Sequence, residues 1–155
     1  MKITWNELLI DFSTMQNDFL QDWRWLIGSD SLPVIVSSIG DAFLQEKDGS
    51  IWWLDAGAGQ YSQVADSGDD FKKKMISNSN DWFLPGLIGD LLTSGTKLSI
   101  NQCFSYKKPP VLGGKYEPDN FEPCDISVHF SILGQIHLKI KDLPEGTPIG
   151  SVKIK

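Results

Sequence analysis

The sequence predicts one compact α+β domain of 155 residues, in which an antiparallel β-meander packs against several helices. Apolar residues recur at spacings of three and four near both ends of the chain, which is typical of amphipathic helices. Between them, residues 34–64 hold β-branched and aromatic runs separated by turn residues. A chain of this length can bury a hydrophobic core without a disulfide framework, and only Cys103 and Cys124 occur. We therefore expect a single domain over residues 1–155.

The first predicted element is an amphipathic helix over residues 4–26. Thr4 and Glu7 have the spacing of a capping box, in which each side chain satisfies a backbone donor of the other residue. Apolar residues then continue at helical spacing from Trp5 onward. Gly28 ends the pattern, and Pro33 prevents it from resuming.

A meander of three or four strands is predicted next. Asp48-Gly49 is a strong signal for a tight hairpin turn, and the small residues 56–59 indicate a second turn. The expected strands are residues 34–36, 42–46, 51–55 and 60–64.

Three helices are predicted after the meander. The first is capped by Asp66 or Ser67 and extends to Ile76, and a short strand is expected at residues 103–104. Proline is tolerated in a first helical turn, so Pro85 is compatible with a second helix. This second helix covers residues 81–92. The third helix is capped by Asp125 or Ser127 and runs to residue 140. A β-like tail is expected at residues 149–154.

No set of residues predicts catalysis, a metal site or a cofactor site. His129 and His137 are eight residues apart on one predicted helix, which separates them by roughly 12 Å. That distance is too long for joint ligation of one metal ion, and no zinc motif surrounds them. The sequence favours a protein that is not an enzyme. One alternative stays open, a hydrolase that uses Cys124 with His129 or His137.

The charge is unevenly distributed. Residues 1–70 hold twelve acidic residues against three basic ones, a net charge of −9, whereas residues 71–155 hold eight against eleven, a net charge of +3. An acidic half repels nucleic acids and anionic membranes but attracts basic proteins and accelerates their association. The charge distribution therefore fits either an ordinary solvated acidic surface or a contact surface for a basic protein, and nucleic acid and membrane are not expected as partners.

Aromatic residues leave three hypotheses open. Six Trp and eight Phe fit a Trp-rich core, but they also fit a recognition surface or an aromatic pocket. A small-molecule-binding or regulatory module is the alternative that such a pocket would support. Residues 109–116 combine two prolines with two glycines, which fits either a close backbone approach or a preorganised contact loop.

Several segments resemble the C-terminal domain of bacterial type VI secretion immunity proteins of the Tdi type. The most specific is Ser-Ile-Leu-Gly-Gln-Ile-His at residues 131–137, within a likeness that runs from about Ile39 to Ile149. The matching segments are residues 40–44, 53–55, 82–85, 108–116, 128–137 and 140–144. Longer relatives carry a GAD-like domain before this one. Since little chain precedes Ile39 here, we expect only the N-terminal helix in that place.

The resemblance implies an immunity protein that binds and neutralises a cognate effector toxin, often a DNase. A nuclease carries a basic site for phosphates, and an acidic inhibitor could occupy it. No secretion signal or membrane span is found, which favours the bacterial cytoplasm, and both a monomer and a homodimer are compatible with the sequence. The expected toxin-binding residues are seven acidic side chains and one aromatic anchor: Asp41, Glu46, Asp48, Asp55, Asp66, Asp69, Asp70 and Trp52.

Overall fold

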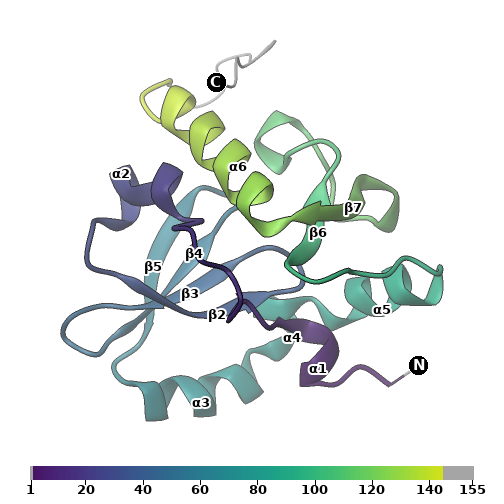
Figure 1. The fold of residues 1–155 in the computed structure, drawn as a ribbon, viewed down its shortest axis with the longest axis horizontal. Helices are drawn as coiled ribbons and strands as arrows, with labels where there is room; N and C mark the ends of the chain where they lie inside the picture. Colours follow the sequence, from purple (N-terminus) through teal and green to yellow (C-terminus); the bar gives the residue numbers. More distant parts are fainter. Residues whose placement is uncertain (1, 145–155) are drawn as a thin grey trace.

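The computed structural model describes residues 2–144 (Figure 1). Five antiparallel strands form the main sheet in the order β1-β2-β3-β4-β5, so sequence neighbours are also neighbours in the sheet. They are β1 (Leu9–Ile10), β2 (Leu32–Ser37), β3 (Ala42–Gln45), β4 (Ile51–Asp55) and β5 (Gln60–Ala65). The predicted α+β meander is confirmed, with β1 as an additional edge strand. The tail predicted at residues 149–154 lies outside the described residues.

The prediction of one long N-terminal helix is wrong. The capping box at Thr4 and Glu7 is present, but the helix that it starts, α1 (Trp5–Leu8), ends after one turn. Asp11 then accepts a hydrogen bond from the backbone N–H of Ser13 at 2.9 Å, and Asp18 accepts one from that of Leu20 at 3.0 Å. Such local side-chain bonds compete with helical ones.

Several apolar residues of this N-terminal segment are nevertheless buried. A short 3₁₀ turn, η1 (Gln21–Trp23), and α2 (Arg24–Ile27) follow the turns. Of the residues at the predicted helical spacing, Leu8, Phe19 and Trp23 are buried, Leu9, Phe12, Met15 and Leu26 are half-buried against the core, and Trp5 is exposed. The pattern therefore identified only part of the buried set, since Leu20 and Ile27 also lie in the core, and the backbone that presents these residues is mostly irregular.

Three helices follow the meander: α3 (Gly68–Ser77), α4 (Ser79–Phe83) and α5 (Pro85–Thr93). Ser67 caps α3 by accepting a hydrogen bond from the backbone of Asp70 at 3.1 Å, as predicted. The single helix predicted over residues 81–92 is wrong, because Leu84 interrupts it in the left-handed conformation at φ 49°. Pro85 disfavours the right-handed helical region for the residue before it, and it then serves as the first residue of α5.

A two-stranded sheet and the longest helix complete the described chain. The predicted short strand is β6 (Gln102–Tyr106), and it pairs with β7 (Phe121–Asp125), a strand that the sequence did not predict. Two 3₁₀ turns, η2 (Pro110–Leu112) and η3 (Pro118–Asn120), lie between them. The final predicted helix is confirmed as α6 (Ile126–Ile140). A hydrogen bond of 2.8 Å from the backbone of Phe104 to Ser38 O joins the two sheets.

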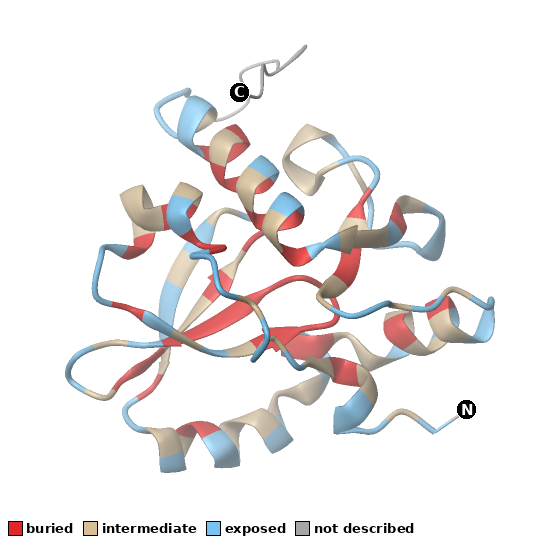
Figure 2. Cartoon of the chain, viewed as in Figure 1, coloured by how far each residue is buried: buried red, intermediate tan, exposed pale blue. Residues whose placement is uncertain are grey.

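Aromatic side chains fill the space between the main sheet and the helices. Phe43 of β3 contacts the rings of Phe71 on α3 and of Trp82 and Phe83 on α4, with centroids 5.2–5.5 Å apart. Elsewhere in the core, the Trp23 indole donates to Phe130 O of α6 at 2.8 Å. Buried residues accordingly concentrate in the central strands and on the inner side of α6 (Figure 2).

Within the described residues, none of the helices is both long and apolar enough to cross a membrane.

Candidate functional site

The predicted contact residues lie at two opposite ends of the main sheet. Asp41 directly precedes β3 and Asp55 ends β4, so these two lie together at one end, which we call the pocket end. The β3–β4 turn and the β5–α3 junction form the other end, which we call the hairpin end. The remaining predicted residues belong to the hairpin end: Glu46, Asp48, Trp52, Asp66, Asp69 and Asp70.

At the hairpin end, the turn residues are held by local hydrogen bonds. Asp48 is exposed and accepts from both the backbone and the hydroxyl of Ser50, and these bonds lower the pKa of its carboxyl group. The half-buried Trp52 indole donates to the same hydroxyl at 2.9 Å and stacks on Tyr61. The hydroxyl of Tyr61 in turn donates to Glu46. Trp52 and Glu46 are therefore engaged within the fold and are only partly available to a partner.

The acidic residues at the start of α3 are more accessible. Asp66 and Asp69 are exposed, and Asp70 is half-buried. Asp70 accepts from the backbone of Asp66 and pairs with Lys74 at 3.1 Å, contacts that lower the pKa of Asp70. Asp48, Asp66 and Asp69 thus give the hairpin end an exposed negative surface.

The pocket end holds its carboxylates differently. Asp41 is only 6% exposed; it accepts from the backbone of Ala56 at 3.0 Å and from the indole of Trp53 at 3.2 Å. Burial, followed by repulsion from the neighbouring Asp55, raises the pKa of Asp41. Burial also raises the pKa of the half-buried Asp55, although backbone donors at Ala58 and Gly57 oppose that rise.

Aromatic walls surround these two carboxylates. A cavity of about 230 Å³ is lined by four aromatic residues together with acidic and aliphatic ones. Its lining consists of Ile39, Asp41, Trp53, Asp55, Asp81, Trp82, Leu84, Tyr106 and Tyr116. The sequence anticipated an aromatic pocket only as an alternative, and it did not identify Asp81, Tyr106 or Tyr116 as parts of one.

A pinned loop brings Tyr116 to the rim of this cavity. The Asn120 amide donates to Lys108 O at 2.9 Å and to Lys115 O at 3.0 Å, which ties the segment 108–116 together. A side chain at Gly114 would lie 1.7 Å from Lys108 O, so this position requires glycine. The close backbone approach predicted for the segment is present, and the same contacts hold the loop in one conformation.

Gly57 supports the two tyrosines from behind. The hydroxyl of Tyr106 donates to that of Tyr116 at 3.4 Å, and a Cβ atom at Gly57 would lie 2.5 Å and 2.7 Å from these two oxygens. The carbonyl of Gly57 also accepts from Nε2 of His137 at 3.2 Å. The small residues after β4 thus form a turn and also allow α6 and the tyrosine pair to pack closely.

The two histidines and two cysteines form no metal cluster among residues 2–144. His129 is buried, with Nε2 2.7 Å from Gly40 O and Nδ1 2.7 Å from the Ser105 hydroxyl. Since a carbonyl only accepts, Nε2 carries the proton, and burial lowers the pKa of His129 to about 4. Cys103 and Cys124 are free and face each other across β6 and β7, and burial raises both thiol pKa values. A neutral thiol and an imidazole with both nitrogens occupied do not form an activated nucleophile.

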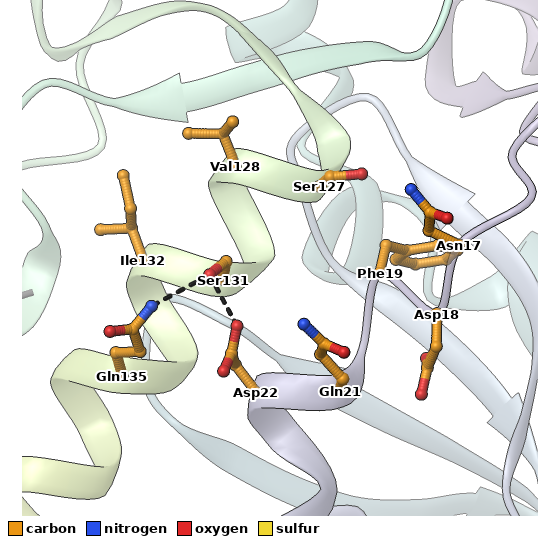
Figure 3. A pocket seen from close by; sticks show the side chains of 10 residues that line it. All are labelled: Asn17, Asp18, Phe19, Gln21, Asp22, Ser127, Val128, Ser131, Ile132 and Gln135. Atoms are coloured by element: carbon orange, nitrogen blue, oxygen red, sulfur yellow. Dashed lines mark hydrogen bonds between the residues drawn. The ribbon is translucent and has the colours of Figure 1, made fainter. Parts of the chain in front are cut away.

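A larger and more open groove of about 500 Å³ lies between α6 and residues 17–22. Figure 3 shows Ser131 at its centre, donating to Asp22 at 2.6 Å and accepting from Gln135 at 3.0 Å. Val128 and Ile132 are exposed beside these polar groups. The polar centre of this groove is satisfied within the protein, so the pocket end is the stronger candidate.

Residues 65–137 match the family model described as T6SS immunity protein Tdi1, C-terminal. The matched segment begins at the end of β5 and ends within α6. It therefore contributes one side of the aromatic cavity, with Asp81, Trp82 and the two tyrosines, whereas the meander before it contributes Asp41, Trp53 and Asp55. No curated protein matches the chain.

Proposed function

We propose that the chain binds a cognate effector toxin and neutralises it by protein–protein contact, because residues 65–137 match the family model described as T6SS immunity protein Tdi1, C-terminal. Immunity proteins of this secretion system protect a cell by binding the toxin. Their surface must therefore recognise a protein partner and need not catalyse a reaction. The described residues support that role. Their titratable groups cap helices, hold turns and form ion pairs, and the carboxyl groups that line the cavity have no lysine or arginine partner among these residues.

We propose further that the effector is a nuclease. The observation that carries this proposal is the exposed acidity of the hairpin end, at Asp48, Asp66 and Asp69. A nuclease must bind phosphates through basic residues, and a negative surface that reaches those residues would exclude the substrate and speed association. Since a DNase acts on the DNA inside the cell, the proposal places the encounter in the cytoplasm.

Protection of cells tests the proposal directly. An effector gene found next to the gene of this chain would be expressed in a sensitive bacterium, with and without the chain. We expect growth only when both proteins are present, intact chromosomal DNA in the protected cells, and a 1:1 complex on purification. Failure to protect would overturn the immunity role. Protection from an effector that leaves DNA intact would overturn the nuclease part alone.

A further inference from the structure

We propose that the aromatic cavity at the pocket end binds the guanidinium group of an arginine side chain on the effector. This inference rests on the proposed function and names the chemistry by which one of its surfaces would recognise the partner. It is carried by the shape of the cavity, by the charges in its lining and by the rigidity of its walls.

The size of the cavity favours a single side chain. Sites for small molecules and cofactors commonly enclose roughly 300–1,000 Å³, and this cavity measures about 230 Å³. Asp41 and Ile39 are buried in its lining, whereas Asp81 and Tyr116 are exposed, and Tyr116 retains 47% of its accessible surface. The cavity is therefore open to the surface at one side, as the insertion of a partner's side chain requires.

The charge of the lining favours a cation. Three carboxyl groups line the cavity, at Asp41, Asp55 and Asp81. Within residues 2–144, the ion pairs formed by lysine and arginine involve Asp18, Asp30, Asp70 and Asp142, none of which lines it. A buried carboxylate without a counter-charge is costly, and a cation that enters beside it offsets that cost.

The aromatic walls select guanidinium over ammonium. Trp53 and Trp82 lie with ring centroids 6.3 Å apart, and Tyr106 and Tyr116 meet edge to face at 5.7 Å. A planar guanidinium stacks on such rings and can donate two parallel hydrogen bonds to one carboxylate. Lysine offers a compact, strongly hydrated charge and loses more on entering an apolar cavity.

The walls are already in place in the free protein. Gly57 packs against the tyrosine pair, Asn120 pins the loop before Tyr116, and Asp41 is fixed by bonds to Ala56 and Trp53. A preorganised site loses little conformational entropy when a ligand binds. The same rigidity makes binding to a short peptide measurable without the rest of the effector.

Short peptides test the site on the whole chain. The probe is acetyl-Gly-Arg-Gly-amide, with citrulline and lysine peptides of the same length as controls, and the readout is the NMR signal of the Trp53 and Trp82 indole N–H groups. We expect saturable shifts with arginine at millimolar affinity, weaker shifts with lysine, and none with citrulline, which keeps the shape but lacks the charge. No shift with arginine, or equal shifts with citrulline, would overturn the proposal.

A matched pair of variants locates the binding. Asp81→Asn removes an exposed carboxylate from the rim, whereas Asp90→Asn removes an exposed carboxylate from α5 away from the lining. Because Asp81 is exposed, its loss should lower the affinity for the arginine peptide by only about fivefold. Asp90→Asn should leave the affinity for this peptide unchanged. As a second variant, Gly57→Ala pushes the tyrosine hydroxyls from their place and should abolish the shifts. Equal affinity for the arginine peptide in the wild type and the three variants would contradict binding in the cavity.

The source of the guanidinium and the proposed function are tested separately. Free arginine carries an α-ammonium and an α-carboxylate whose charges cancel, so it should bind no more tightly than the peptide. Tighter binding of free arginine would identify a small-molecule site and overturn the effector as its source. Protection of cells without any peptide binding would overturn the cavity proposal and leave the immunity role intact. Peptide binding by a chain that protects no cell would overturn the effector as the partner.

Discussion

At the hairpin end of the main sheet, Asp48 and Asp70 accept hydrogen bonds from backbone donors, and Asp70 also pairs with Lys74. At the pocket end, Asp41 and Asp55 face each other with aromatic rings around them and no described lysine or arginine in contact. The pKa values of Asp48 and Asp70 are accordingly lowered, whereas those of Asp41 and Asp55 are raised. Carboxylates that are close in the sequence thus have different roles. Those at the hairpin end stabilise turns and a helix start, and those at the pocket end line a cavity in which no lysine or arginine pairs with them.

Packing differs between the two ends as much as charge does. Gly40 and Gly49 both have φ 87°, and each occupies a turn beside β3. A Cβ atom at Gly40 would lie 2.3 Å from Nε2 of His129, whereas one at Gly49 would meet no heavy atom within 4 Å. His129 of α6 therefore packs directly on the turn at Gly40, whereas no neighbouring group packs on the turn at Gly49.

The largest effect is expected from alanine at these two glycines. Gly49→Ala should lower the free energy of unfolding by about 1 kcal/mol, because only the left-handed backbone is strained. Gly40→Ala adds overpacking against His129 and the loss of its hydrogen bond, so it should cost about 3 kcal/mol or more. Chemical denaturation of the two variants measures the difference. Equal losses would contradict the close packing of His129 on the turn.

The second prediction concerns pH. The pKa of His129 is lowered to about 4 in the folded chain, against about 6.5 when unfolded. Stability from this group is therefore complete above pH 6.5 and decreases as the pH falls toward 4, because only the unfolded chain takes up the proton. The loss amounts to about 3 kcal/mol. His129→Gln should lack this part of the pH dependence of unfolding.

An NMR titration of the His129 ring provides the direct check. The ring should stay neutral down to about pH 4, with the proton on Nε2 that donates to Gly40 O. A midpoint near 6.5 would mean that the ring is hydrated, and it would contradict the packing on which the first prediction also depends.

The meander could be predicted from the sequence because its signals are local. Alternation, β-branched runs and the Asp48-Gly49 turn each act within a few residues, and four of the five strands follow from them. The prediction of one N-terminal helix failed for a physical reason. Apolar residues at helical spacing can also pack against a core from an irregular backbone, which here contains Asx turns at Asp11 and Asp18. Strand β7 carries Pro123 and Cys124 and has no such signal.

The pocket could not be predicted because it combines five separate segments. Asp41 and Asp55 were both among the expected contact residues, but nothing in the sequence indicates that the first is buried beside the second. Trp82 was assigned to a helix, and Tyr116 to a loop with two open interpretations. Only the small residues around Gly57 gave a usable signal, since a close approach requires glycine and here it admits Tyr106 and Tyr116.

A smaller effect is expected from the cap of α3 at the hairpin end. Ser67→Ala removes the acceptor for the Asp70 N–H and should lower the free energy of unfolding by about 1 kcal/mol. Ser77→Ala, at the other end of the same helix, removes an exposed hydroxyl that donates to Lys74 O and accepts from the Asn78 amide, but caps no backbone N–H, and it serves as the control. If both variants unfold like the wild type, the acidic start of α3 is not positioned by its cap.

The smallest effect, and the one that tests the hairpin end as a contact surface, concerns association rates. Asp69→Lys reverses an exposed charge in the first turn of α3, and Asp90→Lys makes the same change on α5. If the hairpin end steers a basic effector, Asp69→Lys should slow association several-fold at low salt and have little effect at high salt, where exposed charges are screened. Asp90→Lys should change the rate less. Stopped-flow binding across a salt series separates the two, and thermal unfolding of each variant excludes a loss of α3 as the cause. Unchanged rates for Asp69→Lys at every salt concentration would leave the pocket end as the surface that recognises the partner.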